Sequence, residues 1–317
     1  MQSIAWDKTP IKVAGMYRDV PLDAYHGGSI CDGPSVSSTG LRTIYNQSPA
    51  HYFDASPYNL APSEDEEAEW KVTGRAAHHL LVGGVGTFSA EFVIRPARIA
   101  GAAWHGNRTE CRDWLRDQKA AGLIVLTHDQ VETIKGMSLA LGRHPLVANG
   151  GLLDGQIERS LFWPDPETGV WVKARPDAIP NASGDVGDLK TTKSVLWPDL
   201  VRTLDSAGYC QQGALIADGF KVVLDIEVTA FVLVFVEKKR PYCVRVVPVH
   251  PDDIERGRRM NRVAIRRFAD CWNAGTWPGP GEDDFNYIKL SDNARERIDK
   301  RLSFELDPRE PPREAAA

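Results

Sequence analysis

The segment that most constrains the fold is VTAFVLVFVEKKRPYCVRVVPV, residues 228–249. Two apolar stretches rich in Val and Phe flank a charged turn at 237–241, and this pattern predicts a β-hairpin. A long helical segment follows at 251–275, and a helical segment that breaks near Gly208 precedes the hairpin at 198–220. Strands and helices are therefore interspersed in this half of the chain.

Three further strands are expected before these elements. The first two alternate in polarity and are joined by the turn PDPETG, whereas the third is short. They cover residues 156–163, 169–179 and 184–190. The order after residue 150 is thus β-β-β-α-α-β-β-α, which predicts an α/β fold with a mixed central sheet flanked by helices.

Residues 1–150 are expected to form a helical part that packs on this core. Short strands are predicted at 91–96 and 122–127, and helices at 38–46, 63–83, 108–121 and 127–145. Capping boxes that pair Ser63 with Glu66 and Thr127 with Gln130 indicate two of the helix starts. We therefore expect a core at 151–280 after the helical part, and then a partly disordered extension at 281–317.

Composition narrows the class of protein. The 317 residues are 42% hydrophobic and 26% charged, as is ordinary for a globular enzyme. No run approaches about 18 apolar residues and the start lacks the pattern of a signal peptide, so we expect a cytoplasmic protein without membrane contact. The five cysteines form no C-x-x-C pair, which argues against a zinc knuckle or a redox pair. The net charge of −5 argues against a DNA-binding surface over the whole protein but allows a local basic channel.

The candidate chemistry lies in KARPDAIPNASGDVGDLKTT, residues 173–192. Residues two apart on a strand share a face, so Asp188 and Lys190 should project together while Leu189 is buried on the other side. Asp177 ends the preceding strand and Glu158 lies on the strand before that. Three adjacent strands could thus gather three carboxylates and a lysine. Such carboxylates repel one another unless a cation binds, and hard oxygen ligands select Mg²⁺ or Mn²⁺.

The same residues also fit a purely structural interpretation. An Asp after Pro is common in turns, and a D-x-K pattern on a strand is common on a solvated face with a weak ion pair. From the residues alone, the interpretation of residues 173–192 as a metal site and their interpretation as a surface hairpin have equal weight.

The segment ARPDAI…GDVGDLKTTKS resembles the core motif of the PD-(D/E)XK nuclease superfamily. More narrowly, it resembles the RecE-like exonuclease VIII group, which phages and prophages often encode. Other segments resemble that group in the same order: SVSSTGLRTIYNQSPAHY (35–52), GRAAHHLLV (74–82), GYCQQGALIADG (208–219), FVEKKRPYCVRV and WNAGTWPGP. The resemblance implies a restriction-endonuclease-like core.

The resemblance also implies roles for individual residues. Asp177 and Asp188 would be the principal metal ligands and Lys190 the catalytic lysine. Glu158 would be an additional acidic ligand, and His78 would ligate or position a second metal. Gln212 would belong to the catalytic set as well, and its amide would hold the lysine or a DNA phosphate.

Several other residues are expected to contact DNA. Tyr209 lies three positions before Gln212 on the same helical face. Arg258 and Arg262 belong to a stripe of arginines on the helix at 251–275, which fits either a phosphate track or a solvated face that covers the core with arginine stems. Lys193 and Arg202 lie closer in sequence to the carboxylates, and we favour them slightly as substrate contacts.

The activity that the resemblance implies is Mg²⁺-dependent degradation of linear double-stranded DNA from its ends, 5′ to 3′, to expose single strands for recombination. Mn²⁺ should substitute for Mg²⁺. The late cysteines are too dispersed for an iron–sulfur cluster, and without a P-loop no ATP is expected. A ring-like homo-oligomer and a RecT-like single-strand annealing protein are the implied partners. Two alternatives are a structure-specific or endonucleolytic PD-(D/E)XK nuclease, and a DNA-binding scaffold with a degenerate site.

Overall fold

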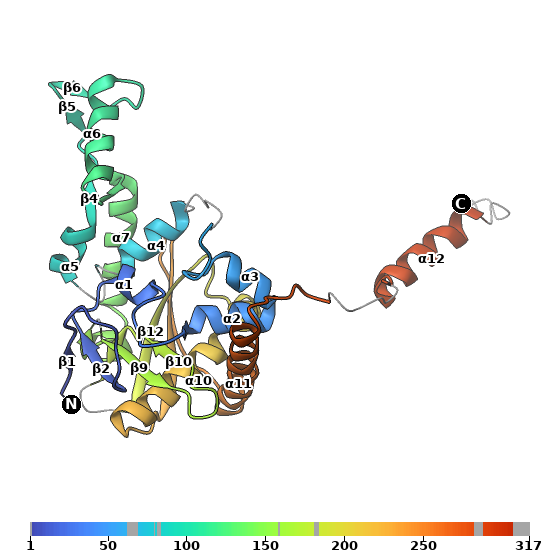
Figure 1. Cartoon of the computed structure of the whole chain (residues 1–317). Coiled ribbons are helices and arrows are strands. Elements are labelled where there is room, and N and C mark those ends of the chain that lie inside the picture. Colours follow the sequence, from blue (N-terminus) through green and yellow to red (C-terminus); the bar gives the residue numbers. More distant parts are fainter. Residues whose placement is uncertain are drawn as a thin grey trace, which may run out of the picture. The chain divides into compact units, whose positions relative to one another are not determined.

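The computed structural model describes residues 2–61, 69–78, 80, 84–157, 159–180, 184–281 and 288–306. The chain divides into two units, Met1–Pro280 and Gly281–Ala317. The second unit contains the helix α12 (Asp292–Leu306). The first unit contains the sheets and the hydrophobic cores (Figure 1).

A five-stranded sheet has the strand order β1-β2-β9-β10-β3. Its central strands β9 and β10 are antiparallel and are joined by the predicted turn, while β1, β2 and β3 come from the start of the chain. The bounds are β1 (Ile4–Ala5), β2 (Gly15–Arg18), β3 (Ser35–Ser37), β9 (Ser160–Pro164) and β10 (Trp171–Ala174). The short helix α1 (Leu22–His26) lies between β2 and β3 in the chain and supplies Tyr25 to a core with Phe162 and Trp171.

A three-stranded sheet contains the predicted apolar hairpin. Its strands are β12 (Asp185–Thr192), β13 (Ala230–Glu237) and β14 (Val244–Pro248). β12 is parallel to β13, and β13 is antiparallel to β14. Alternate residues of β13 belong to different cores, since Leu233 and Phe235 face one core and Val234 and Val236 face another. Helices therefore cover both faces of this sheet, which explains why its strands are so apolar.

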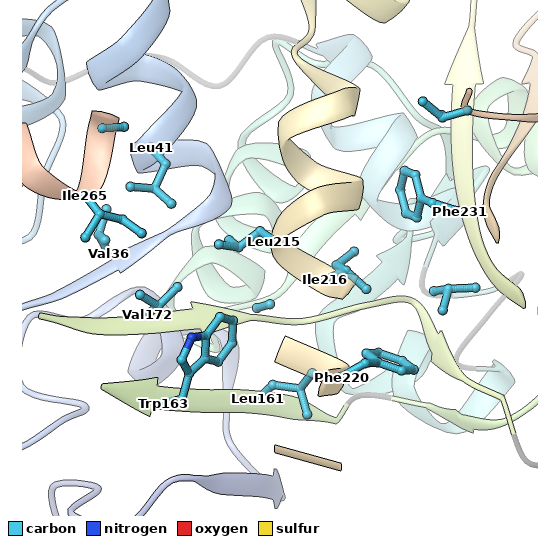
Figure 2. Close-up of a cluster of buried hydrophobic side chains, with 14 of the residues drawn as sticks. Val36, Leu41, Leu161, Trp163, Val172, Leu215, Ile216, Phe220, Phe231 and Ile265 are labelled. Carbon is cyan, nitrogen blue, oxygen red and sulfur yellow. The ribbon is translucent and has the colours of Figure 1, made fainter. Parts of the chain in front are cut away.

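The largest core lies where helices pack between β9–β10 and β13. These elements are α2 (Ser38–Asn46), α3 (Pro49–Asp54), α9 (Trp197–Ser206), α10 (Tyr209–Gly219), the π-helix η2 (Phe220–Leu224) and α11 (Pro251–Ala274). Figure 2 shows Leu215 and Ile216 of α10 above Val172 and Leu161 of the sheet, with Phe231 of β13 nearby. Full burial of each such side chain stabilises the fold by about 1.5–3 kcal/mol, so this core holds α10 firmly against both sheets.

A second core covers the other face of β12 and β13. α4 (Glu69–His78) and α7 (His128–Leu141) pack there together with the parallel pair β4 (Phe92–Ile94) and β7 (Ile124–Leu126). The predicted capping box of Thr127 and Gln130 begins α7. The remaining elements of the first unit are α5 (Gly84–Glu91), β5 (Arg98–Ile99), β6 (Ala102–Ala103), α6 (Thr109–Ala120), α8 (Pro145–Ala148), β8 (Gln156–Ile157) and β11 (Ala178–Ile179).

The structure differs from the sequence-based prediction mainly in the first 150 residues. The expected helical part also contains strands, and β1, β2 and β3 belong to the same sheet as β9 and β10. The unit Met1–Pro280 contains both the expected helical part and the expected core, and the expected boundary at residue 150 stays a prediction. Strands of two to four residues are too short to show a period of two, and their partners are distant in sequence. The predicted cap at Ser63 and Glu66 lies outside the described residues, as do residues 307–317.

Among the described residues, no helix is both long and apolar enough to cross a membrane.

Candidate active site

The site is built on β12. Asp188 and Lys190 occupy one face of the strand, as their spacing predicts, and Leu189 points into the second core. Lys190 Nζ lies 2.5 Å from Asp188 Oδ2, and the Asp188 side chain is only 1% exposed. The D-x-K pattern is therefore no solvated surface pair, and the attraction between the two charges has to offset the cost of removing them from water.

Asp177 reaches the same place from the loop between β10 and β11. Its Oδ2 accepts a hydrogen bond from the Leu189 backbone N–H at 2.6 Å and lies 2.8 Å from His78 Nε2. His78 is the last residue of α4. This helix approaches β12 closely at Gly74, where an added Cβ would lie 3.2 Å from Thr191 Oγ1. One helical turn separates Gly74 from His78, so α4 delivers the imidazole to the carboxylate.

The first turn of α10 closes the site from another side. Gly208 takes the left-handed conformation, with φ of 63°, and this turn separates α9 from α10 where the sequence predicted a break. Gln212 Nε2 donates a hydrogen bond to Asp188 Oδ1 at 2.8 Å. The Tyr209 ring centroid lies 5.0 Å from Lys190 Nζ. Gln212 thus contacts the carboxylate of the D-x-K pair, and Tyr209 contacts its lysine.

Residues that sequence reasoning missed fix this turn in place. Arg42 of α2 donates to the carbonyl oxygen of Ala207, and Asn46 Nδ2 donates to Gln211 Oε1 at 3.1 Å. Gln211 is fully buried, and its backbone oxygen accepts a hydrogen bond from Asn261 Nδ2 at 2.8 Å. No local pattern distinguishes Gln211 from its neighbour Gln212. The resemblance points to Gln212, and the packing of α10 against α2 and α11 buries Gln211 and turns Gln212 toward Asp188.

The buried charges shift one another's pKa values. Burial and the nearby Asp177 charge raise the pKa of Asp188 to about 6, although Lys190 opposes the shift. Burial alone would also raise the pKa of Asp177, but His78 and Lys190 hold it below its ordinary value. The pKa of Lys190 is raised against the effect of burial by Asp188 and Asp177, so its ammonium stays charged. The site therefore holds two competing carboxylates with a fixed positive charge beside them.

This donor set fits a hard divalent cation. Asp188 Oδ2 lies 2.5 Å from Lys190 Nζ, and a carboxylate oxygen has two accepting lone pairs, so one of them remains for a cation. A cation shared by Asp177 and Asp188 would relieve the repulsion that raises the pKa of Asp188. Within the described residues, no three His, Cys, Asp or Glu side chains form a metal-binding group. Glu158, the expected additional ligand, lies outside the described residues.

The strands around the site are paired differently from the expectation. β11 pairs with β8, and β12 pairs with β13, so the acids are not carried by three adjacent strands of one sheet. Asp177 is joined to β12 by its own carboxylate, through the bond to the Leu189 N–H. A side-chain hydrogen bond, and not pairing between adjacent strands, therefore brings Asp177 next to β12.

Arg258 and Arg262 of α11, two of the expected DNA contacts, form ion pairs with acidic residues of the protein itself. Arg258 Nε lies 2.7 Å from Asp218 Oδ1, and its Nη1 contacts Glu255. Arg262 binds Asp165, in the turn that precedes β10, with both guanidinium Nη atoms. Asp165 precedes β10 and Asp177 follows it, so Arg262 binds at the opposite end of this strand from the candidate metal ligand. The structural interpretation of the arginine stripe therefore agrees with the contacts better than the phosphate track does.

Lys193 and Arg202, two more of the expected contacts, follow β12 in the chain. Lys193 is exposed directly after β12. Arg202 is exposed on α9 and pairs with Asp199 of the same helix. Neither contacts Asp177 or Asp188 in the described part of the chain, so their contribution to substrate binding stays a prediction.

A mixed α/β core in which an Asp from the loop after β10 meets a D-x-K pair on β12, with the start of α10 against that pair, is the arrangement of a PD-(D/E)XK nuclease. Within that superfamily, this chain belongs to the family described as PDDEXK-like domain of unknown function (DUF3799), which matches residues 46–290. PD-(D/E)XK nucleases generally use divalent metal ions, in agreement with the donor set.

The fold is similar to that of a solved protein. The crystal structure of a "putative exonuclease" from Eubacterium rectale matches with a TM-score of 0.54 and 13% identity, covering 82% of this chain and 91% of that one. At this identity the likeness shows the fold alone. The comparison with curated proteins finds no match.

Proposed function

We propose that this protein is a Mg²⁺-dependent exodeoxyribonuclease that degrades linear double-stranded DNA from its ends. The observation that carries the proposal is the convergence of Asp177, Lys190 and His78 around the buried Asp188. Membership of the PDDEXK-like family supports phosphodiester hydrolysis. The choice of ends, the 5′ to 3′ polarity and a role in recombination rest on the resemblance of the sequence segments to the RecE-like group.

The residues of the site have distinct tasks in this reaction. Asp177 and Asp188 would hold the cation, and a bound Mg²⁺ or Mn²⁺ supplies Lewis acidity toward a phosphate oxygen and a water molecule. The Leu189 N–H fixes Asp177, and Gln212 fixes Asp188, so both carboxylates are oriented before substrate binds. The Lys190 ammonium has three donors and stabilises the negative charge that develops on the phosphate under attack.

The proposed preference for DNA ends is argued from the chemical groups that the site can bind. Carboxylates and an ammonium address phosphate oxygens, and phosphate contacts carry no direct sequence information. Selectivity would then come from geometry, which a ring-like homo-oligomer threaded by one DNA end provides. A RecT-like annealing protein is the partner that would take up the exposed strand.

The test compares linear and closed circular forms of one plasmid. Nucleotide release from the linear form is expected with Mg²⁺ or Mn²⁺, but not with EDTA and not from the Asp188→Asn variant. Labels at the 5′ or the 3′ ends give the polarity. Efficient cutting of the closed circle would instead support the endonuclease alternative. Salt-sensitive DNA binding without any cleavage would support the scaffold alternative.

A further inference from the structure

The first turn of α10 contacts both charged members of the D-x-K pair. Gln212 bonds to Asp188 Oδ1, while the ring of Tyr209 faces the ammonium of Lys190 with 5.0 Å between Nζ and the ring centroid. A cation at this distance over an aromatic face is attracted by the negative face of the ring. Lys190 Nζ therefore lies between the Asp188 carboxylate on one side and an aromatic ring on the other.

The ring is held in place by its neighbours. Its centroid lies 6.1 Å from that of Phe235, and Phe235 is the residue of β13 directly opposite Lys190 in the parallel ladder. The turn at Gly208 sets where α10 begins, and a Cβ on Gly208 would lie 2.8 Å from Arg42 Cδ. Backbone, sheet and α2 thus fix Tyr209, whereas Lys190 is a flexible side chain.

The face of the ring, and not its hydroxyl, makes the contact with the site. Within the described residues, the Tyr209 hydroxyl has no hydrogen bond. A phenol that served to bind a phosphate would have to turn its hydroxyl toward the substrate. The ring is half-buried against Phe235 and faces Lys190, so its geometry suits an action through the lysine.

The lysine needs such a contact because of the charges beside it. Asp188 and Asp177 both attract the ammonium, and an unrestrained four-carbon side chain would settle wholly between them. An ammonium buried between two carboxylates would occupy the space of the cation and face away from a phosphate. The aromatic face of Tyr209 attracts the ammonium from a direction other than that of the two carboxylates, and it carries no charge that would bind the cation.

We propose that Tyr209 is a positioning residue for the reaction, whose aromatic face holds the Lys190 ammonium at the edge of the Asp188 carboxylate. This rests on the proposed nuclease activity, and it replaces the DNA contact that the sequence predicted for Tyr209. Tyr209 acts only through Lys190 and touches neither substrate nor cation.

The first experiment compares Tyr209→Phe with Tyr209→Leu in nucleotide release from linear duplex DNA. The Phe variant keeps the aromatic face and should retain kcat within about 2-fold. The Leu variant should lose kcat about 10- to 30-fold, as expected from loss of a partly desolvated cation–π contact. KM and the Kd for DNA in EDTA should change little in either variant. Tyr45→Leu, which removes a partly buried tyrosine from α2 next to the same core, is the matched control and should leave kcat unchanged.

The second experiment needs no catalytic activity. Tyr209→Leu is made in the wild type and in Lys190→Met, and the Tm of all four proteins is measured in EDTA. If ring and ammonium interact, Tyr209→Leu lowers Tm by a few degrees more in the wild type than in Lys190→Met. This cycle still decides the proposal if the wild type cleaves no DNA, in which case the proposed function alone fails.

Three results would overturn the proposal. Equal losses of kcat in the Phe and Leu variants would show that the hydroxyl is the functional group. Weaker DNA binding with unchanged kcat in the Leu variant would make Tyr209 a substrate contact. Additive changes of Tm in the cycle would show that Tyr209 and Lys190 are independent.

Discussion

Replacement of Arg262 by Ala is expected to destabilise the protein without weakening its binding to DNA. Arg262 Nη2 donates to Asp165 Oδ2 at 2.8 Å, and Nη1 donates to the other carboxylate oxygen. Asp165 is 5% exposed and also accepts hydrogen bonds from the backbone N–H and the hydroxyl of Thr168, at 2.9 and 2.7 Å. The pair fastens α11 to the turn between β9 and β10.

The magnitude follows from the burial of the two partners. Removal of one member of a buried ion pair costs about 3–5 kcal/mol, because the other charge stays behind without its partner. Arg262 is 28% exposed, and the two bonds from Thr168 to Asp165 remain, so the lower end applies. A loss of about 3 kcal/mol should lower Tm by about 6–12 °C in a unit of this size.

The assay pairs thermal denaturation with DNA binding measured in EDTA at several salt concentrations. Arg262→Ala should lower Tm and leave the slope of log K against log salt unchanged, since a lost phosphate contact changes that slope by about 1. Arg259→Ala is the control, because Arg259 is 75% exposed on the same helix and its ion contact with Glu255 is long, at 3.5 Å. An unchanged Tm together with a shallower slope would refute the assignment and restore the phosphate track.

Three further substitutions test other parts of the structure. Asp188→Asn should abolish Mg²⁺-dependent cleavage because it removes a ligand charge, while circular dichroism shows an intact fold; near-wild-type release would disprove the site. Gly257→Ala should lower both Tm and kcat, because its Cβ would lie 2.2 Å from the carbonyl oxygen of Cys210 and push α11 away from the first turn of α10; unchanged values would contradict this packing. Burial lowers the pKa of Lys173 to about 8, so between pH 8 and about 10 the unfolded chain binds more protons than the folded protein. The unfolding free energy of the wild type relative to Lys173→Met should therefore rise across that window by up to about 3 kcal/mol in urea melts, and a flat difference would argue against a neutralised Lys173.

Local patterns were sufficient for the parts of the site that lie on single elements. The spacing of Asp188 and Lys190 placed both side chains on one face of β12, and the structure confirms it. The helix at 38–46, the capping box of Thr127 and Gln130 and the break at Gly208 were also predicted and are confirmed. These features depend on neighbours a few residues apart, which a single sequence displays.

Features that depend on distant partners could not be predicted in this way. The arginine stripe of α11 has the spacing of a phosphate track, but the acids that bind Arg258 and Arg262 come from α10 and from the turn before β10. The strands β1, β2 and β3 carry no periodic signal and are defined by their pairing with β9 and β10. The position of Tyr209 under Lys190 likewise requires the register of β12 against β13, which places Phe235 behind the ring.

The segments that resemble the RecE-like group in separate places form one line of contacts in the structure. Arg42 and Asn46, from the segment at 35–52, bind Ala207 and Gln211 and so fix the start of α10. That start, in the segment at 208–219, places Gln212 on the carboxylate of the D-x-K pair and a tyrosine ring against its lysine. Loss of the Arg42 or the Asn46 side chain should therefore act on the carboxylates without touching them. These two segments are therefore parts of one support for the site.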